Sequence, residues 1–425
     1  MLASPGARAD NLRSTPDESP LMQWLDARLG VAARRRVLDG LASWRTGRLT
    51  VHLPDGTTAV LGAAAAEPHA SVRIVRDRFF RRMLLHGDIG VGDAYIDGDW
   101  HTDDLALVVD LALRNQQAAP LESVATQLWN LGDTWRHRRR KNTAAGSRTN
   151  IHAHYDLGNE FFALFLDETL AYSSGVFLAA GDTLEAAQLE KFRQWGERLQ
   201  PRATDHVLEI GSGWGGMALH LARTYGCRVT SITVSEEQRA LASARVAAAG
   251  LRDRVAIELR DYRHVEGRYD RVVSIEMIEA VGQEFWPGFF QAIDRVLAPG
   301  GRVGIQAITI PDQRFDQYVR RSDWIQKHIF PGGLLPCLRE VCAVTARHTR
   351  LAVTDVEDRP LDYATTLRHW RGRFLARLDE VRAMGFDDRF IRTWEYYLAS
   401  CEAAFRTRNL GLAHLTLARV GEDLV

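Results

Sequence analysis

Short apolar runs separated by amphipathic stretches dominate the chain from about residue 151 onward. The runs HVLEIG, RVTSITV, RVAIEL, YDRVVSIEM and GRVGIQAITI have the composition of buried strands. Segments with helical periodicity, such as MALHLARTY and SEEQRALASARVAAAG, lie between them. Strands and helices that alternate in this way are typical of a doubly wound parallel sheet. We therefore predict an α/β, Rossmann-like domain over residues 151–425.

The preceding segment has a different pattern, which predicts a small α+β domain over residues 21–115. GRLTVHLPDGTTAVLG alternates apolar and polar residues around Asp55 and Gly56, and this pattern predicts a hairpin. SVRIV continues the strand pattern, whereas DDLALVVDLALRN has helical periodicity with an aspartate at its start.

Two polar segments flank this small domain. Residues 1–20 are rich in Pro, Ser, Ala and Asp without periodic apolar positions, which predicts a disordered tail. Residues 116–150 form a basic linker that contains WRHRRRK, from Trp135 to Lys141. Such a cluster binds anionic lipid at about 1 kcal/mol per basic residue. A solvated helix face or linker is the alternative interpretation.

Charge and cysteine content exclude several classes of function. The 54 Lys and Arg residues balance 54 Asp and Glu residues, so the net charge gives no argument for a nucleic-acid partner. The four cysteines form no CxxC pair, which fits a reducing cytoplasm, and we expect no metal. No uncharged apolar run approaches the roughly 20 residues that span a bilayer, and the first residues do not resemble a signal peptide.

A glycine-rich turn follows the first predicted strand of the α/β domain. In VLEIGSGWGG, Gly211, Gly213 and Gly216 fit GxGxxG, which permits a tight turn and close approach of a ligand to a helix start. A nicotinamide enzyme usually has an acidic residue at the end of the second strand, where this chain has Thr233 and Ser235. A dehydrogenase is therefore disfavoured, and a glycine turn without a ligand is the remaining structural alternative.

Several longer motifs occur together with this turn and in a fixed order. They are HYDLGNEFFALFLDETLAYSSGVF (154–177), SIEMIEAVGQEFWPGFF (274–290), DWIQKHIFPGGLLP (323–336) and DYATTLRHW (362–370). With these motifs the chain resembles the cyclopropane fatty acid synthases and the mycolic acid methyltransferases. The resemblance implies a class I S-adenosylmethionine-dependent methyltransferase fold with a small lipid-associated amino-terminal domain. It also implies methyl transfer to the cis double bond of an unsaturated phospholipid acyl chain.

The resemblance further implies which residues form the site. The residues expected to bind the cofactor are Tyr172, Ser173, Glu209, Gly211, Gly213, Trp214, Gly215, Thr233, Ser235, Gln238, Asp261 and Tyr262. Members of the family hold a bicarbonate ion beside the double bond, and Glu279 and Tyr363 match two of its ligands. Ser174 stands where the family has a cysteine, and Gln306 stands where it has a histidine. Cys401 matches a further cysteine that is a candidate active-site residue, although we expect it to have a packing role.

The expected chemistry gives these side chains their tasks. Methyl transfer from a sulfonium to an alkene leaves a carbocation, which requires a dry pocket. Aromatic faces stabilise such a cation, although core packing is the alternative role for each of Tyr172, Phe177, Phe285, Trp286, Tyr318 and Trp324. Bicarbonate, oriented by Glu279, would then remove a proton from the transferred methyl group and close a cyclopropane. Glu276 could share the same face as Glu279, and a capping or ion-pairing role is the alternative for either carboxylate.

Several alternatives stay open at this point. Loss of a proton from a neighbouring chain carbon would give a methylene or, after reduction, a methyl branch. A methyltransferase of a soluble metabolite would need neither vesicles nor the amino-terminal domain, and a non-catalytic protein would bind the cofactor without converting it. We expect a cytoplasmic protein at the inner membrane face whose segment Asp316–Leu335 opens as a lid, and a homodimer is compatible with the sequence.

Overall fold

The computed structural model describes residues 20–116 and 157–423. Apart from Pro20 and Gln116, the expected tail and the expected basic linker lie outside the described residues. Contacts divide the chain into two compact units, Met1–Gly132 with Arg377–Ser400 and Asp133–Ala376 with Cys401–Val425. This division assigns Arg377–Ser400 to the first unit, whereas the expected domain of residues 151–425 included that segment. Within the described ranges, every helix is too short or too polar to cross a membrane.

The first unit contains a four-stranded sheet in the order β2-β1-β3-β4. The hairpin predicted around Gly56 is present, since β1 and β2 pair antiparallel and Gly56 has a φ of 82°. Asp104 caps the predicted helix α3 by accepting a hydrogen bond from the Leu107 amide at 3.0 Å. The elements are α1 (Pro20–Leu41), β1 (Arg48–His52), β2 (Thr58–Leu61), β3 (His69–Ile74), α2 (Arg78–Ile96), β4 (Trp100–His101) and α3 (Leu105–Asn115).

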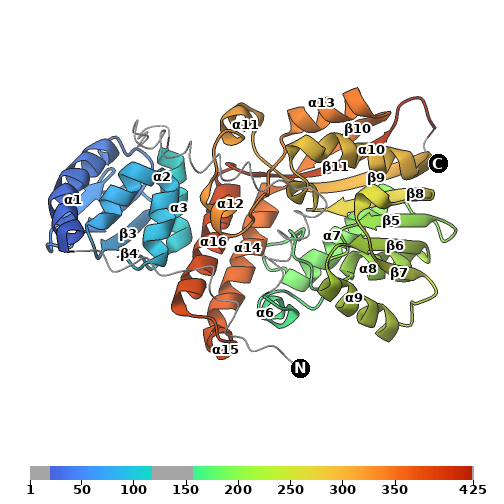
Figure 1. Ribbon diagram of the computed structural model, residues 1–425, viewed down its shortest axis with the longest axis horizontal. Coiled ribbons are helices and arrows are strands. Elements are labelled where there is room, and N and C mark those ends of the chain that lie inside the picture. Colours follow the sequence, from blue (N-terminus) through green and yellow to red (C-terminus); the bar gives the residue numbers. More distant parts are fainter. Residues whose placement is uncertain (1–19, 117–156, 424–425) are drawn as a thin grey trace. The chain divides into compact units, whose positions relative to one another are not determined.

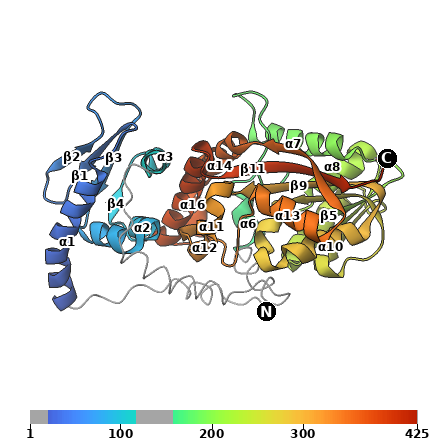
Figure 2. The same ribbon diagram turned by 90° about the horizontal axis from the view of Figure 1, so that it is seen from above.

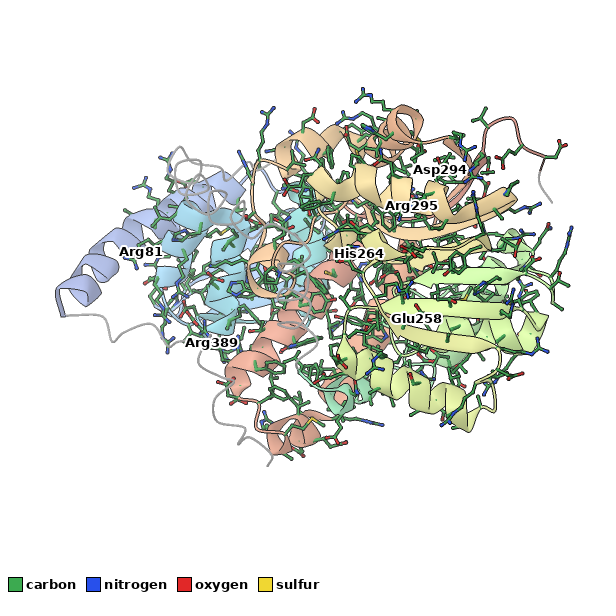
Figure 3. All side chains as sticks on the ribbon, turned by 45° about the vertical axis from the view of Figure 1, so that its right-hand side comes forward. Arg81, Glu258, His264, Asp294, Arg295 and Arg389 are labelled. Carbon is green, nitrogen blue, oxygen red and sulfur yellow. The ribbon has the colours of Figure 1, made fainter. Side chains whose placement is uncertain are left out.

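Two helices from near the carboxyl end complete the first unit. They are α15 (Leu378–Ala383) and the part of α16 (Asp388–Arg406) that ends at Ser400. Arg392 donates to the carbonyl oxygens of Tyr95 at 2.6 Å and Trp100 at 3.1 Å. Arg389, which Figure 3 labels on α16, pairs with Asp97. These contacts attach the helices to residues almost 300 positions earlier in the chain.

The second unit contains a seven-stranded sheet in the order β10-β11-β9-β8-β5-β6-β7 (Figure 1). The strands β9, β8, β5, β6 and β7 run parallel, which confirms the predicted α/β fold, whereas β11 pairs antiparallel with β9 and β10. The apolar runs of the sequence predict the five parallel strands but not β10 or β11. The strands are β5 (His206–Ile210), β6 (Arg228–Thr233), β7 (Val255–Leu259), β8 (Tyr269–Ile275), β9 (Leu297–Thr309), β10 (Leu351–Asp358) and β11 (Gly411–Arg419).

Helices cover both faces of this sheet and enclose two apolar clusters. Figure 2 shows α7 and α8 on one side of the sheet and α10 and α13 on the other. Trp195 and Met217 pack in the first cluster, and Phe289 and Val341 pack in the second. The remaining elements are α6 (Asn159–Ala163), α7 (Leu184–Leu199), α8 (Gly216–Tyr225), α9 (Glu236–Ala248), η2 (Tyr262–His264), η3 (Ile278–Ala280), η4 (Gln283–Phe285), α10 (Trp286–Val296), α11 (Asp312–Tyr318), α12 (Trp324–His328), α13 (Leu338–His348) and α14 (Pro360–Ala376).

Candidate active site

The glycine-rich turn connects the central strand β5 to the start of α8. Gly211 and Gly213 have φ values of 96° and 48°, a region that side chains with a Cβ rarely occupy. A Cβ added to Gly213 would meet no atom within 4 Å, so the backbone there faces open space. The turn therefore leaves room for a ligand beside the first amides of a helix, as the sequence pattern predicts.

A pocket opens at this turn, at the carboxyl ends of the parallel strands. Most of the residues expected to bind the cofactor line it, namely Tyr172, Ser173, Glu209, Gly211, Gly213, Trp214, Thr233, Gln238 and Tyr262. Other residues that line the pocket were not predicted from the sequence, among them Phe192, Arg260 and Met277. A pocket at this edge of a parallel sheet is the usual ligand site of the fold.

The other three residues expected to bind the cofactor do not line the pocket but lie next to residues that do. Gly215, with a φ of 84°, starts α8. Ser235 caps α9 by accepting from the Gln238 amide at 3.2 Å, and Asp261 caps η2 by accepting from the Arg263 amide at 3.0 Å. Each of the three therefore fixes the backbone next to a lining residue.

Glu209 and the pair Thr233 and Gln238 give the pocket its polar groups. Glu209 is buried and accepts a hydrogen bond from Ser231, and burial raises the pKa of its carboxyl group to about 8. The Thr233 hydroxyl donates to the Gln238 side-chain oxygen at 2.9 Å. At the end of β6, where a nicotinamide enzyme would present an acidic residue to a ribose, the pocket thus offers hydroxyl and amide groups.

A second carboxylate, Glu276, lies in the same pocket and accepts three hydrogen bonds. The donors are the Ser174 amide at 2.9 Å, the Gln306 side-chain amide at 2.7 Å and the Tyr363 hydroxyl at 2.7 Å. Glu276 directly follows β8 and has a φ of 50°, an unusual conformation for a residue with a side chain. The protein therefore holds this carboxylate in one orientation with groups from three separate parts of the chain.

The three donors are themselves fixed. The Gln306 side-chain oxygen accepts from the Trp195 indole at 3.1 Å, so its NH₂ group must face Glu276. The Ser174 hydroxyl donates to the Gly175 carbonyl at 2.9 Å, and Tyr363 stacks on Phe405 with ring centroids 4.4 Å apart. Desolvation raises the pKa of the Glu276 carboxyl group, although the donors and the charge of Lys191 oppose that rise.

Glu279 has different contacts from those expected. Its carboxylate accepts from the Ile308 amide at 2.6 Å, and its carbonyl oxygen accepts from the Leu334 amide at 2.8 Å. Among the described residues, its second carboxylate oxygen is buried without a hydrogen-bond partner, and burial raises its pKa to about 8. Tyr363 and Gln306, which were expected to bind a bicarbonate ion beside Glu279, both donate to Glu276 in this structure.

Cys401 is a partly exposed free thiol in the second unit, on α16. It does not line the pocket, and desolvation raises the pKa of its thiol above the ordinary value. A raised pKa disfavours the thiolate, which is the reactive form. These observations fit the expected packing role.

The six aromatic residues considered for cation stabilisation have different positions. Only Tyr172 among them lines the pocket, and its ring lies 5.2 Å from that of Trp370. Trp286 and Trp324 are buried in the core. Phe177 stacks on His369, Arg263 lies over Phe285, and the Tyr318 hydroxyl accepts from the Leu335 amide. Among these six residues, only Tyr172 is therefore placed to stabilise a cation in the pocket.

The segment Asp316–Leu335, expected to act as a lid, is connected by hydrogen bonds in this structure. Gln326 donates to the Tyr318 hydroxyl at 3.2 Å and to the Gly333 carbonyl at 2.9 Å. Asp323 and Gln326 form a capping box at the start of α12. Since Leu334 donates to the Glu279 carbonyl, the segment is joined to the turn that carries Glu276.

Comparison with known proteins gives several matches. The profile of the family described as mycolic acid cyclopropane synthetase matches residues 142–415. The chain is 41% identical over 389 residues to the tuberculostearic acid methyltransferase UfaA1 of Mycobacterium tuberculosis, covering 88% of this chain and 90% of that protein. It is 36% identical over 373 residues to the cyclopropane-fatty-acyl-phospholipid synthase of Escherichia coli, covering 86% of this chain and 91% of that protein.

Solved structures give further matches, each covering part of this chain. The cyclopropane synthase MmaA2 from Mycobacterium tuberculosis matches with a TM-score of 0.60 and 27% identity, over 64% of this chain and 98% of that one. The mycolic acid cyclopropane synthase CmaA1, in a complex with SAH and CTAB, has a TM-score of 0.60 and 28% identity, over 64% of this chain and 97% of that one.

Proposed function

Because the chain belongs to the mycolic acid cyclopropane synthetase family, we propose that it methylates the cis double bond of an unsaturated phospholipid acyl chain. Its place in this family makes it an S-adenosylmethionine-dependent methyltransferase of lipid substrates. The observation that carries the finer proposal is Glu276, a carboxylate held by three donors inside the cofactor pocket.

The pocket fits S-adenosylmethionine. The open space at Gly213 admits a ligand close to the backbone, and Ser173, Glu209 and Gln238 offer hydrogen-bonding groups around it. When bound, this cofactor supplies an electrophilic methyl group on a positively charged sulfur. Tyr172 presents an aromatic ring to the pocket, and such a face stabilises positive charge without reacting with it.

In the proposal, Glu276 acts as the general base. Transfer of the methyl carbon to one alkene carbon leaves a cation on the other, and the cation must lose a proton. Glu276 accepts that proton on its carboxylate and becomes a neutral acid, while the electrons of the broken C–H bond form a new carbon–carbon bond. Its raised pKa makes it a stronger base than an ordinary glutamate.

The bicarbonate ion expected from the family resemblance has no part in this proposal. The Ser174 amide, the Tyr363 hydroxyl and the Gln306 NH₂ group already donate to Glu276, so they do not fit a second anion. A negative ion at that point would also be repelled by the carboxylate. We propose that Glu276 takes over the task that bicarbonate was expected to have.

The position from which the cation loses a proton decides the product. Loss from the transferred methyl group closes a cyclopropane, which is the product that we propose and the one named for the Escherichia coli relative. Loss from a neighbouring chain carbon gives a methyl-branched alkene, whereas a hydride shift onto the cation followed by loss of a proton from the new methyl group gives a methylene branch. Reduction of either would give a methyl branch. The name of the 41% identical relative, a tuberculostearic acid methyltransferase, favours this second candidate.

We further propose that the protein works in the cytoplasm at the inner face of the membrane and that Asp316–Leu335 opens there. Protection of this segment from protease by phospholipid vesicles would support the proposal. Cleavage at the same rate with and without vesicles would contradict it.

The labelled cofactor tests the reaction directly. The protein is incubated with S-adenosylmethionine that carries a trideuterated methyl group and with vesicles of cis-unsaturated phospholipid, and the acyl chains are analysed by mass spectrometry. A cyclopropane and a methylene branch each retain two deuterium atoms, because both form by loss of one from the transferred methyl group, and their fragmentation patterns distinguish them. A methyl-branched alkene formed by loss of a chain proton retains all three. Unchanged acyl chains would refute the proposed function.

A further inference from the structure

Lys191 is a fully buried ammonium group behind the cofactor pocket. It lies on α7 and has no exposed surface, an uncommon state for a lysine. Its ammonium group donates to the Ser173 hydroxyl at 2.7 Å and to the Gln188 side-chain oxygen. Burial of such a charge costs free energy unless neighbouring groups compensate for it. The groups that surround Lys191 therefore indicate why a lysine is buried at this position.

Gln188 and Lys191 together hold the carbonyl and the hydroxyl group of Ser173. The Gln188 NH₂ group donates to the Ser173 carbonyl at 2.7 Å, while Lys191 holds the hydroxyl. Ser173 lines the cofactor pocket, and the next residue, Ser174, donates its amide to Glu276. A shift of Ser173 would therefore disturb the cofactor wall and one of the three donors to the base.

The charge of Lys191 also acts on the carboxylates around it. Glu276, Asp167 and Glu209 attract the ammonium group, and burial lowers its pKa to about 8. In return, Lys191 favours the ionised forms of Glu276 and Glu209. Three other titratable groups belong to the same surroundings: Tyr363 on α14 donates to Glu276, Glu279 on η3 is repelled by it, and His414 on β11 is disfavoured as a cation by Lys191.

We propose that Lys191 is a positioning residue for methyl transfer, which fixes Ser173 through a hydrogen bond and keeps Glu276 deprotonated through its positive charge. The proposal rests on the role of Glu276 as the base. Gln188 helps to separate the two effects, because it holds the same serine and carries no charge, and its side-chain oxygen also accepts a hydrogen bond from Lys191.

Two variants separate the effects. Lys191→Met removes the charge at similar side-chain volume, and Gln188→Leu removes the hydrogen bond to the Ser173 carbonyl and one acceptor of Lys191 but keeps the lysine itself. We expect both to weaken the affinity for S-adenosylhomocysteine about threefold or more, as loss of a neutral or charged hydrogen bond does. Only Lys191→Met should shift the acid limb of the kcat profile, upward by about one pH unit or more, because an opposite charge nearby lowers a carboxyl pKa by that amount.

Arg193→Gln is the matched control. Arg193 is a cation on the same helix, but it is about half exposed and pairs with Glu190 at 2.7 Å. We expect this variant to leave both the affinity and the pH profile unchanged. Thermal unfolding checks that each variant is folded, and Lys191→Gln replaces the methionine variant if that one does not fold.

The outcomes distinguish this proposal from the proposed function. If the wild-type protein methylates acyl chains but Lys191→Met leaves the acid limb in place, the charge role of Lys191 is wrong and the function stands. If the wild-type protein produces no S-adenosylhomocysteine with vesicles, the proposed function fails. In that case the affinities of Lys191→Met and Gln188→Leu for S-adenosylhomocysteine, measured by calorimetry, still test whether the two residues position Ser173. Unchanged affinities would refute this positioning role.

Discussion

Replacement of Glu276 by glutamine tests the assignment of the base. Glutamine has nearly the same size, and its one oxygen can still accept from the Ser174 amide and the Gln306 NH₂ group. Its own NH₂ group would then face the Tyr363 hydroxyl, whose oxygen can accept a hydrogen bond. The fold therefore tolerates the change, but the side chain can no longer accept a proton.

The expected effects on rate and on stability differ in size. Loss of a positioned general base slows a reaction by about 10²–10⁴-fold, which corresponds to roughly 3–5 kcal/mol on the barrier. A hydrogen bond to a charged group contributes about 1.5–3 kcal/mol to stability. The neutral side chain avoids the desolvation penalty of a buried charge, which offsets part of that loss. We therefore expect Glu276→Gln to unfold at nearly the wild-type temperature while turnover is almost lost.

The assay measures S-adenosylhomocysteine release with vesicles of cis-unsaturated phospholipid, and calorimetry measures its binding in the absence of lipid. Glu279→Gln serves as the control, because Glu279 does not line the pocket and its oxygen can still accept from Ile308. We expect this control to retain turnover within about threefold, a loss of less than 1 kcal/mol on the barrier. Full activity of Glu276→Gln, or loss of activity only in Glu279→Gln, would refute the reasoning and return the catalytic role to Glu279.

Three further changes have expected outcomes. The folded-state pKa of Glu279 is about 8, above the ordinary 4.5, so its contribution to stability is present below about pH 4.5 and is lost as the pH rises through 8. Glu279→Gln should thus be more stable than the wild type at pH 9 in urea unfolding, by at most about 5 kcal/mol, and equal stability at pH 9 would contradict the burial argument. Burial lowers the pKa of His414 from 6.5 to about 3, so stability is lost as the pH falls from 6.5 toward 3. His414→Leu should therefore keep its melting temperature at pH 4 to 5 better than the wild type, and parallel losses of melting temperature would count against this explanation. Gly213→Val places a branched side chain at a φ of 48° and in the open space of the pocket. We expect S-adenosylhomocysteine to bind at least about tenfold more weakly, a loss of 1.4 kcal/mol, and wild-type affinity in calorimetry would show that the turn does not face the ligand.

Periodicity predicted the parallel part of the sheet because each of its strands is a continuous apolar run. The strands β10 and β11 could not be predicted from continuous apolar runs, for two different reasons. LAVTDVED in β10 has exposed acidic residues at the edge of the sheet, and His414 interrupts the apolar pattern of β11. The attachment of Arg377–Ser400 to the first unit could not be predicted either, because it depends on contacts such as Arg392 with Tyr95 across almost 300 residues.

The cofactor turn could be predicted from sequence because one local motif contains its strand, glycines and helix start. Which of Glu276 and Glu279 lines the pocket could not be predicted, since both lie in the same short motif and differ in where the backbone directs them. The φ of 50° at Glu276 decides that direction, and residue type gives no sign of it. Lys191 was also missed, because a lysine on an amphipathic helix ordinarily belongs to its solvent face.

The late segment of the first unit has a consequence for the order in which the protein can mature on the ribosome. Residues 20–116 leave the exit tunnel long before Arg377–Ser400 is synthesised, yet Tyr95 packs against Tyr396 and donates to Glu395 in the finished protein. Domains usually fold as they emerge, beginning with the amino-terminal one. The amino-terminal unit of this protein therefore cannot complete its fold until nearly the whole polypeptide has been translated, and part of its apolar surface stays uncovered until then.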